Sequence, residues 1–244
     1  MTVGGGHRRA LEDASIAIAE GEIVGIAGVS GNGQAALAAL VAGLAPPGVG
    51  TMRLFGAPVA RHDPRTFARS GVARIPEDRH HDGVVGAMTV AENVALEEIR
   101  EPAFQRGGFL RFAAIRSRAV DAIRDYDVRC QGPDAPARLL SGGNIQKLIL
   151  ARVLDRKPRL ILANQPTRGL DIGAQTEVHR RLLAAREKGA GVLLISEDLD
   201  ELMMLSDRIA VMYAGRLSEA LPADGIDRGT LGMMMAGHVE EKAA

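Results

Sequence analysis

Aromatic residues are scarce in this chain of 244 residues. It has no tryptophan, two tyrosines and five phenylalanines, so aromatics make up 3% of the sequence. A core must therefore be built from Leu, Ile, Val, Ala and Met, and few rings are available to stack on nucleic-acid bases. The formal net charge is zero, and no block of five or six like charges occurs. We therefore expect no nucleic-acid partner, because such a partner needs a concentrated basic surface.

Cysteines and long apolar runs are also missing. Cys130 is the single cysteine, which excludes a disulfide within the chain and fits a reducing cytosol. No run approaches the ~18 continuous apolar residues that a membrane-spanning helix needs. The first residues, MTVGGGHRRALED, lack the apolar core of a signal peptide, and we predict a flexible lead-in there. With 46% hydrophobic and 25% charged residues, the composition is ordinary for a soluble globular protein.

Short strand-like runs alternate with helical patterns along most of the chain. Several runs are almost uniformly apolar, as expected for strands that helices cover on both faces. This order predicts an α/β fold with a mostly parallel sheet. Residues from about 89 to 157 break the rhythm with helical patterns and no convincing strand, so we predict an inserted helical subdomain there. The strand-like runs are 15–19, 22–27, 51–55, 71–75, 159–163, 191–196 and 208–214.

The stretch GVSGNGQAAL, residues 28–37, lies between a strand-like run and a helical pattern. Its glycines have the spacing of a P-loop, G-x-x-x-x-G-K-[ST], in which backbone N–H groups cradle phosphates, the lysine reaches the β- and γ-phosphates and the hydroxyl binds Mg²⁺. Gln34 holds the lysine position and Ala35 the hydroxyl position. This spacing fits a phosphate loop, and it fits equally a strand-to-helix turn that needs glycines at positive φ. The candidate residues are Gly28, Ser30, Gly31, Asn32, Gly33, Gln34 and Ala35.

A second glycine segment, RLLSGGNIQKLILARVL, spans residues 138–154. Ser141, Gly142 and Gly143 open a helix, and a helix N-terminus with exposed N–H groups is an anion site. The same three residues could also form an ordinary N-cap turn. LSGG followed by this helical pattern closely resembles the signature motif of ABC-transporter ATPases, and Asn144 follows directly.

Three further segments resemble the remaining motifs of that family. RLILANQPTRGLDIGA (159–174) is similar to the Walker B strand and D-loop, with Asn164 at the aspartate position, Gln165 at the catalytic glutamate position and Asp171 in the D-loop. LLISEDLD (193–200) is similar to the switch region, with Glu197 at the histidine position. ARIPED (73–78) is similar to the strand that leads into the Q-loop, with Glu77 at the glutamine position.

The chain is thus identified by resemblance as an ABC-transporter nucleotide-binding domain, from about residue 10 to residue 237. Within the family it looks like the carboxy-terminal half of a tandem ATPase of a simple-sugar or nucleoside importer. The resemblance implies a P-loop NTPase fold of the ABC type, with a small antiparallel β part. It also implies a single domain over 1–244 with the helical subdomain at about 89–157. Because such tandem proteins are about twice as long, we expect this chain to be a fragment.

Domains of this family work as head-to-tail pairs, so the resemblance implies contributions to two ATP sites. In the chain's own site the substitutions at Gln34, Ala35, Asn164, Gln165 and Glu197 predict weak ATP binding, no intact catalytic residue and no bound metal. No aromatic residue precedes Ser15 to stack on adenine, where His7 is a poor substitute. In the partner's site, which holds the Mg²⁺, the chain is expected to lend the segment Ser141, Gly142, Gly143 and Asn144, while Asp171 helps to join the sites.

The resemblance also implies the assembly around the chain. The expected partners are a second, intact ABC ATPase domain, a transmembrane permease and a periplasmic or lipoprotein substrate-binding protein. The expected location is cytoplasmic, peripheral on the inner face of the cell membrane. An alternative is a non-hydrolytic module that senses nucleotide or only holds the dimer together. The transported substrate is not encoded in these motifs, because specificity in this family lies with the binding protein and the permease.

Overall fold

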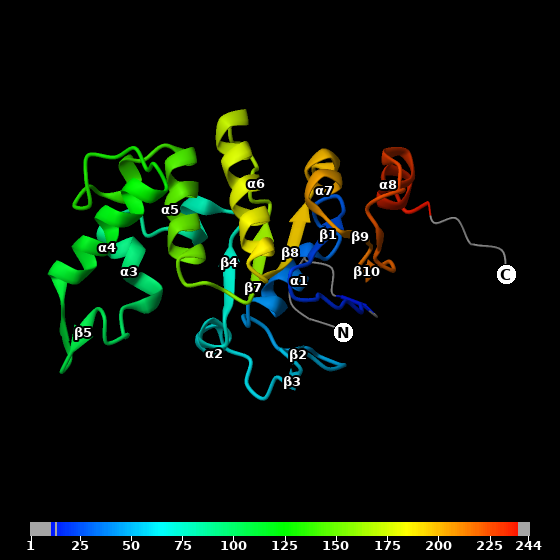
Figure 1. Ribbon diagram of the computed structural model, residues 1–244. Helices are drawn as coiled ribbons and strands as arrows, with labels where there is room; N and C mark the ends of the chain where they lie inside the picture. The colour runs from blue at the N-terminus through cyan, green and yellow to red at the C-terminus, as the bar shows by residue number, and fades with distance from the viewer. Residues whose placement is uncertain (1–10, 13, 239–244) are drawn as a thin grey trace. The chain divides into compact units, whose positions relative to one another are not determined.

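The computed structural model describes residues 11–12 and 14–238 (Figure 1). The lead-in predicted for residues 1–13 therefore falls almost wholly outside the described residues, and so does His7. The chain divides into two compact units, which we describe one at a time. The first comprises Met1–Arg74, Arg159–Gln165 and Leu183–Ala244, and the second Ile75–Pro158 and Pro166–Leu182.

A seven-stranded sheet, counted over the described residues, forms the centre of the first unit. Its order is β10-β9-β1-β8-β7-β4, and β11 also pairs with β9. The pairs β1–β8, β1–β9 and β7–β8 are parallel, whereas β10 and β11 run antiparallel to β9. This confirms the predicted α/β fold with a mostly parallel sheet. The strands are β1 (Ile23–Ala27), β4 (Val72–Ile75), β7 (Leu160–Asn164), β8 (Gly191–Ser196), β9 (Arg208–Tyr213), β10 (Arg216–Leu217) and β11 (Leu221–Pro222).

Helices cover both faces of this sheet. On one face, α1 (Gln34–Val41) and α2 (Pro64–Arg69) share a buried apolar cluster with Ile26 and other strand residues. On the other face, α7 (Leu199–Leu205) approaches so closely that a Cβ on Gly25 would lie 2.4 Å from the Ser206 hydroxyl. A residue with a side chain would force this helix off the sheet, so the glycine is needed here for packing. A further helix, α8 (Arg228–Met235), packs against β9.

The strand predicted at 15–19 is wrong. Residues 14–19 belong to no strand, and the carbonyl of Ala17 accepts a hydrogen bond from the Arg208 guanidinium at 2.9 Å instead of entering a ladder. The strand expected at 51–55 is reduced to β2 (Arg53–Leu54), which pairs antiparallel with β3 (Ala57–Pro58). The strand ends because Phe55 and Gly56 both adopt positive φ. This short hairpin belongs to the antiparallel β part that the resemblance implied.

The second unit is mainly helical, as the patterns predict. Its helices α3 (Val90–Ala95), α4 (Phe112–Asp125) and α5 (Gly142–Leu154) contact one another, and α6 (Ile172–Glu187) begins in the second unit and ends in the first. The expectation of no strand in this region is wrong, because β5 (Gln105–Arg106) and β6 (Phe109–Leu110) form a hairpin. Its turn residues, Gly107 and Gly108, have φ of 59° and 85°. Two glycines at positive φ are the favoured chemistry of a tight hairpin turn.

The start of α3 is fixed by its own side chains. The Thr89 hydroxyl accepts from the Glu92 N–H at 3.2 Å and the Glu92 carboxylate accepts from the Thr89 N–H at 2.7 Å, which forms a capping box. Asn93 is fully buried, and its side chain bonds to the backbone of Val85 in both directions. No helix in residues 11–12 and 14–238 combines the length and apolar character needed to cross a membrane.

Candidate functional site

Three predicted site segments lie at one edge of the parallel sheet in the first unit. The glycine loop follows β1, Gln165 follows β7 and Glu197 follows β8. In the register of these strands, Ala27 pairs with Ser196 and Asn164 pairs with Ile195. Since the strands are parallel and aligned, their carboxyl ends bring these loops together, which is where ligands bind in open α/β sheets.

Within the loop, the side chain of Gln34 is bonded to the loop itself. Its Nε2 donates to the carbonyl of Val29 at 2.9 Å, and its Oε1 accepts from the N–H of Asn32 at 3.1 Å. Gln34 is 9% exposed. A lysine could donate to a carbonyl in this position but could not accept from an N–H. The glutamine therefore occupies a backbone donor of the kind that a P-loop offers to phosphate.

The loop is also anchored at its far end. Asn32 donates from Nδ2 to the Val29 carbonyl at 3.0 Å and accepts with Oδ1 from the N–H of Ala214 at 3.0 Å. Gly28 has no room for a side chain, because a Cβ there would lie 2.5 Å from the Gln34 amide nitrogen. Gly33 has φ of 123°, in the region that favours glycine. Both glycines are thus required by the loop's shape, in a segment that has neither the lysine nor the hydroxyl of the P-loop pattern.

The loops that follow β7 and β8 are linked by a hydrogen bond between the Gln165 side chain and the Glu197 backbone. Asn164 ends β7 in a buried position with a neutral amide where a carboxylate would attract Mg²⁺. Gln165 adopts φ of 50°, unusual for a non-glycine residue. Its Oε1 accepts from the N–H of Glu197 at 3.4 Å. An amide cannot take a proton from an attacking water, so this constellation contains no general base at Gln165.

The signature segment, residues 141–144, lies in the second unit, and its hydrogen bonding differs from that of the glycine loop. Ser141 is the N-cap of α5, yet its hydroxyl makes no capping hydrogen bond to the helix backbone. Instead it accepts from Nδ2 of Asn144 at 2.8 Å. In the described part of the chain, the N–H groups of Gly142 and Gly143 have no acceptor. The segment therefore presents unused donors at the positive end of a thirteen-residue helix.

The orientation of the Asn144 amide follows from a second contact. Its Oδ1 accepts from the backbone N–H of Arg129 at 2.8 Å, so the NH₂ group must face Ser141. Because the Ser141 oxygen accepts this hydrogen bond, its own hydrogen is free to point elsewhere. The contact with Asn144 thus leaves the Ser141 hydrogen available for donation.

A cavity of about 450 Å³ adjoins the signature segment within the second unit. Lys147 lines it and pairs with Asp127 at 2.8 Å, which holds the pKa of that carboxyl below its ordinary value. Glu177 also lines it, and hydrogen bonds from Arg180 and then Arg181 lower the pKa of Glu177 from 4.5 to about 2. Charged groups of both signs are thus fixed beside the segment.

The ion pairs of Glu177 predict a defined pH dependence of stability. Its pKa is lowered in the folded state, so the stabilisation is complete above the unfolded value near 4.5 and is lost as pH falls toward about 2. We expect Glu177→Gln to be less stable than the unmodified chain at neutral pH, with the difference shrinking across that range. Urea unfolding at several pH values measures this, and a difference that stayed constant from pH 6 to pH 2 would contradict it.

Sequence reasoning missed two arginines of the second unit. Arg168 pairs with Glu77, the residue at the Q-loop position, at 2.6 Å. Arg79 donates to the carbonyl of Arg168 at 2.6 Å, and a Cβ on Gly142 would lie 3.2 Å from its Nε. These two side chains connect the Glu77 segment, the loop after β7 and the signature segment. Arg79 directly follows the stretch ARIPED and Arg168 belongs to RLILANQPTRGLDIGA, but no spacing rule indicates that they meet.

Asp171 is exposed and engaged locally. Its Oδ1 accepts from the N–H of Ala174 at 2.9 Å at the start of α6. This is a helix-capping contact. The role across a dimer that the resemblance implied for Asp171 stays a prediction.

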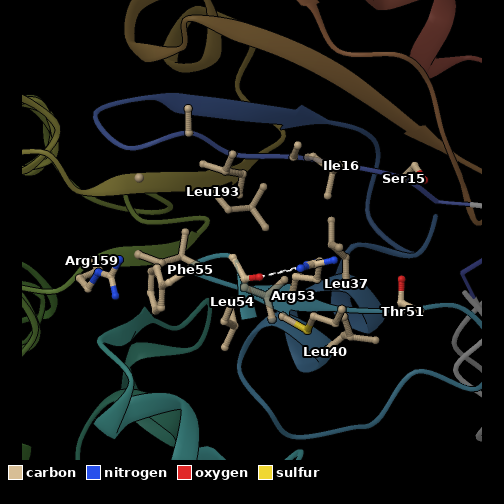
Figure 2. A pocket seen from close by; sticks show the side chains of 18 of the residues that line it. Ser15, Ile16, Leu37, Leu40, Thr51, Arg53, Leu54, Phe55, Arg159 and Leu193 are labelled. Carbon is tan, nitrogen blue, oxygen red and sulfur yellow. Dashed lines mark hydrogen bonds between the residues drawn. The ribbon is translucent and has the colours of Figure 1, made fainter. Parts of the chain in front are cut away.

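A larger cavity, of about 640 Å³, lies in the first unit away from these residues. Figure 2 shows Arg53, Leu54 and Phe55 on one side and Ile16 and Leu193 on the other. The Arg159 guanidinium stacks on the Phe55 ring at 3.8 Å. None of the predicted site residues lines this cavity.

A strand, a glycine loop with P-loop spacing and a following helix at the edge of a parallel sheet define a P-loop nucleotide-binding domain. The profile of the ABC transporter family matches residues 11–168, and the chain belongs to this family. Its fold is that of solved ABC cassettes. The dimeric ATP-binding cassette MJ0796 bound to ADP and Pi matches with a TM-score of 0.75 and 23% identity, over 92% of this chain and 96% of that one.

Curated relatives resemble the chain more closely in sequence. The "Nucleoside import ATP-binding protein NupA" of Lactococcus lactis subsp. cremoris is 43% identical over 91% of this chain and 44% of its own length. The "Glucose import ATP-binding protein TsgD13" of Haloferax volcanii is 44% identical over 93% and 42%. The "Guanosine import ATP-binding protein NupO" of Bacillus subtilis is 42% identical over 96% and 46%. The chain therefore spans less than half the length of these relatives.

Proposed function

We propose that this chain is the nucleotide-binding domain of an importer for sugars or nucleosides and that its own Walker site is degenerate. It hydrolyses little or no ATP there and supplies its signature segment to the ATP site of a partner domain. The observation that carries this proposal is a contrast in hydrogen bonding. Gln34 occupies a donor of the glycine loop. In contrast, the Asn144 contact leaves the Ser141 hydrogen free, and among the described residues the N–H groups of Gly142 and Gly143 have no acceptor.

The substitutions in the chain's own site weaken ATP binding, Mg²⁺ coordination and catalysis together. A hydrogen bond to a charged partner contributes about 1.5–3 kcal/mol, and the neutral amide of Gln34 recovers only part of what an ammonium gives. Ala35 and Asn164 offer Mg²⁺ neither a hydroxyl nor a carboxylate. A general base at position 165 would be worth about 10²–10⁴-fold. Glu197 adds negative charge where phosphoryl transfer develops negative charge. ATP binding here is weak, and Mg²⁺ is held only at the partner's site.

In the partner's site, the chain contributes donors without providing a base or a metal ligand. The Ser141 hydroxyl and the N–H groups of Gly142 and Gly143 converge at the N-terminus of α5. Such preorganised donors stabilise the charge of a transferring phosphoryl group. Asn144 positions the Ser141 hydroxyl. Asp171 helps to join the two sites.

The relatives support the proposed assembly. The names of these relatives describe import of nucleosides, glucose and guanosine. Each relative is more than twice as long as the segment that matches this chain. We propose that the partner is a second, intact ABC domain in the N-terminal half of the same protein. A transmembrane permease and a periplasmic or lipoprotein substrate-binding protein complete the transporter, and the domain lies at the cytoplasmic face of the membrane. We also propose that residues 1–244 form one domain, with the helical subdomain at about 89–157.

The test is the ATPase rate of the paired domains when Ser141 and Gln165 are replaced in turn: replacing Ser141 should reduce the rate, and replacing Gln165 should leave it unchanged. The alternative, a non-hydrolytic module that senses nucleotide or holds a dimer together, predicts no change with either replacement. Co-purification with the permease separates a transporter subunit from a regulatory module that acts elsewhere.

A further inference from the structure

Large apolar side chains are exposed together around the β5–β6 hairpin. Phe109 is 80% exposed, Leu110 40% and Phe112 69%. Phe109 and Leu110 form β6 and Phe112 begins α4, so the three belong to one continuous stretch. Figure 1 shows the hairpin extending past the ends of α3 and α4. Isolated apolar residues on a surface are ordinary, but a cluster on a projecting hairpin indicates a contact site.

Three arginines of the same stretch have no acidic partner among the described residues. Arg100, Arg106 and Arg111 are exposed, and among the described residues none of them pairs with a carboxylate. Arg111 donates to the carbonyls of Pro102 and Ala103 at 3.3 and 3.2 Å, which keeps it beside the hairpin. Residues 100–112 contain three arginines and one acid, Glu101. The cluster is therefore positively charged although the whole chain is neutral.

We propose that this hairpin binds an anionic membrane surface, with Phe109, Leu110 and Phe112 entering the interface and the three arginines contacting lipid headgroups. Apolar and aromatic side chains beside arginines suit the boundary between headgroups and acyl chains, where the arginine stems lie along apolar surface and the charges stay hydrated. A basic residue near an anionic leaflet gains about 1 kcal/mol, a factor of about five. A projecting tip inserts into a lipid surface more readily than it encloses a peptide. The inference does not depend on ATP binding or on the proposed pairing.

The absence of tryptophan makes the test direct. Phe109→Trp would give the chain its single indole at a position that is 80% exposed. With vesicles of equal parts phosphatidylserine and phosphatidylcholine, we expect its emission to shift to the blue and to be quenched by brominated lipid, and this response to weaken as salt is raised. Val49→Trp is the matched control, because Val49 is 70% exposed in the first unit, and its emission should not change.

Charge and apolar contact are then removed separately. Replacing Arg100, Arg106 and Arg111 with glutamine should lower partitioning onto the anionic vesicles by at least about tenfold, and Phe109→Ser with Phe112→Ser should abolish it. The proposal is wrong if the indole at 109 shows no shift, shifts equally with pure phosphatidylcholine, or behaves like the indole at 49. It is also wrong if the hairpin variants weaken only the association with a permease, since the surface would then contact protein.

Discussion

Ser141→Phe is expected to reduce the ATPase rate of the paired domains by about a hundredfold or more, the effect of losing preorganised donors at a phosphoryl-transfer site. The phenyl ring would replace the free hydroxyl and cover the N–H groups at the start of α5. Ser141 is exposed, so the larger side chain need not disturb the core. Phosphate release by the complex of this chain with its partner domain, at saturating ATP, measures the effect.

The matched control is Gln165→Ala in the same complex. The proposal puts Gln165 at the position of a catalytic glutamate, and because an amide offers no base, its loss should leave the rate unchanged. Asn144→Asp is a finer variant, since a carboxylate keeps the acceptor for the Arg129 N–H but would draw in the Ser141 hydrogen and add negative charge. It should slow hydrolysis as well. Full activity of Ser141→Phe, or a large loss with Gln165→Ala, would contradict the proposal that hydrolysis needs the signature segment of this chain but not its own Walker site.

Gln34→Lys combined with Ala35→Thr is expected to raise the affinity of the isolated chain for MgATP by about tenfold or more. The lysine would replace the internal acceptor of the Asn32 N–H with an ammonium that attracts phosphate, and the threonine would offer Mg²⁺ a hydroxyl. A single hydrogen bond to a charged partner is worth about 1.5–3 kcal/mol, which is enough for this gain. Isothermal titration calorimetry measures the change.

The prediction for Gln34→Lys with Ala35→Thr depends on the backbone shape of the glycine loop. Gly28 and Gly33 already allow the backbone to adopt the cradle, so two side chains should restore phosphate binding without redesigning the loop. Ser141→Phe serves as the control, because it should leave the affinity of the chain's own site unchanged. An unaltered affinity in the double variant would mean that the loop does not face phosphate.

The sheet could be predicted from the sequence because its strands are uniformly apolar runs that alternate with helices. The error at 15–19 has a physical cause, since Ala17 satisfies its carbonyl with the Arg208 side chain, and an apolar run does not reveal its hydrogen-bond partner. The β5–β6 hairpin was missed because each of its strands has two residues, too short for any periodicity, although the Gly107–Gly108 pair is a turn signal.

For the candidate site too, some features could be predicted from the sequence and others could not. Resemblance to the motifs of the family indicated Gly28, Ser141, Asn164 and Glu197 as candidates, because motifs are local in sequence. The contact from Asn144 to Ser141 also follows from their i, i+3 separation on a helix. In contrast, the approach of Arg79 to Gly142 joins residues far apart along the chain, and only the folded backbone reveals it. The internal bonds of Gln34 likewise depend on the particular loop conformation.

The central claim is that this chain keeps the form of a phosphate loop while hydrolysis takes place at a partner's site. Titrating the unmodified, isolated chain with ATP, with and without Mg²⁺, tests it most directly. We predict weak binding that Mg²⁺ does not strengthen, because Ala35 and Asn164 provide no charged or hydroxyl ligand for the ion. Tight binding that depends on Mg²⁺ would contradict the claim.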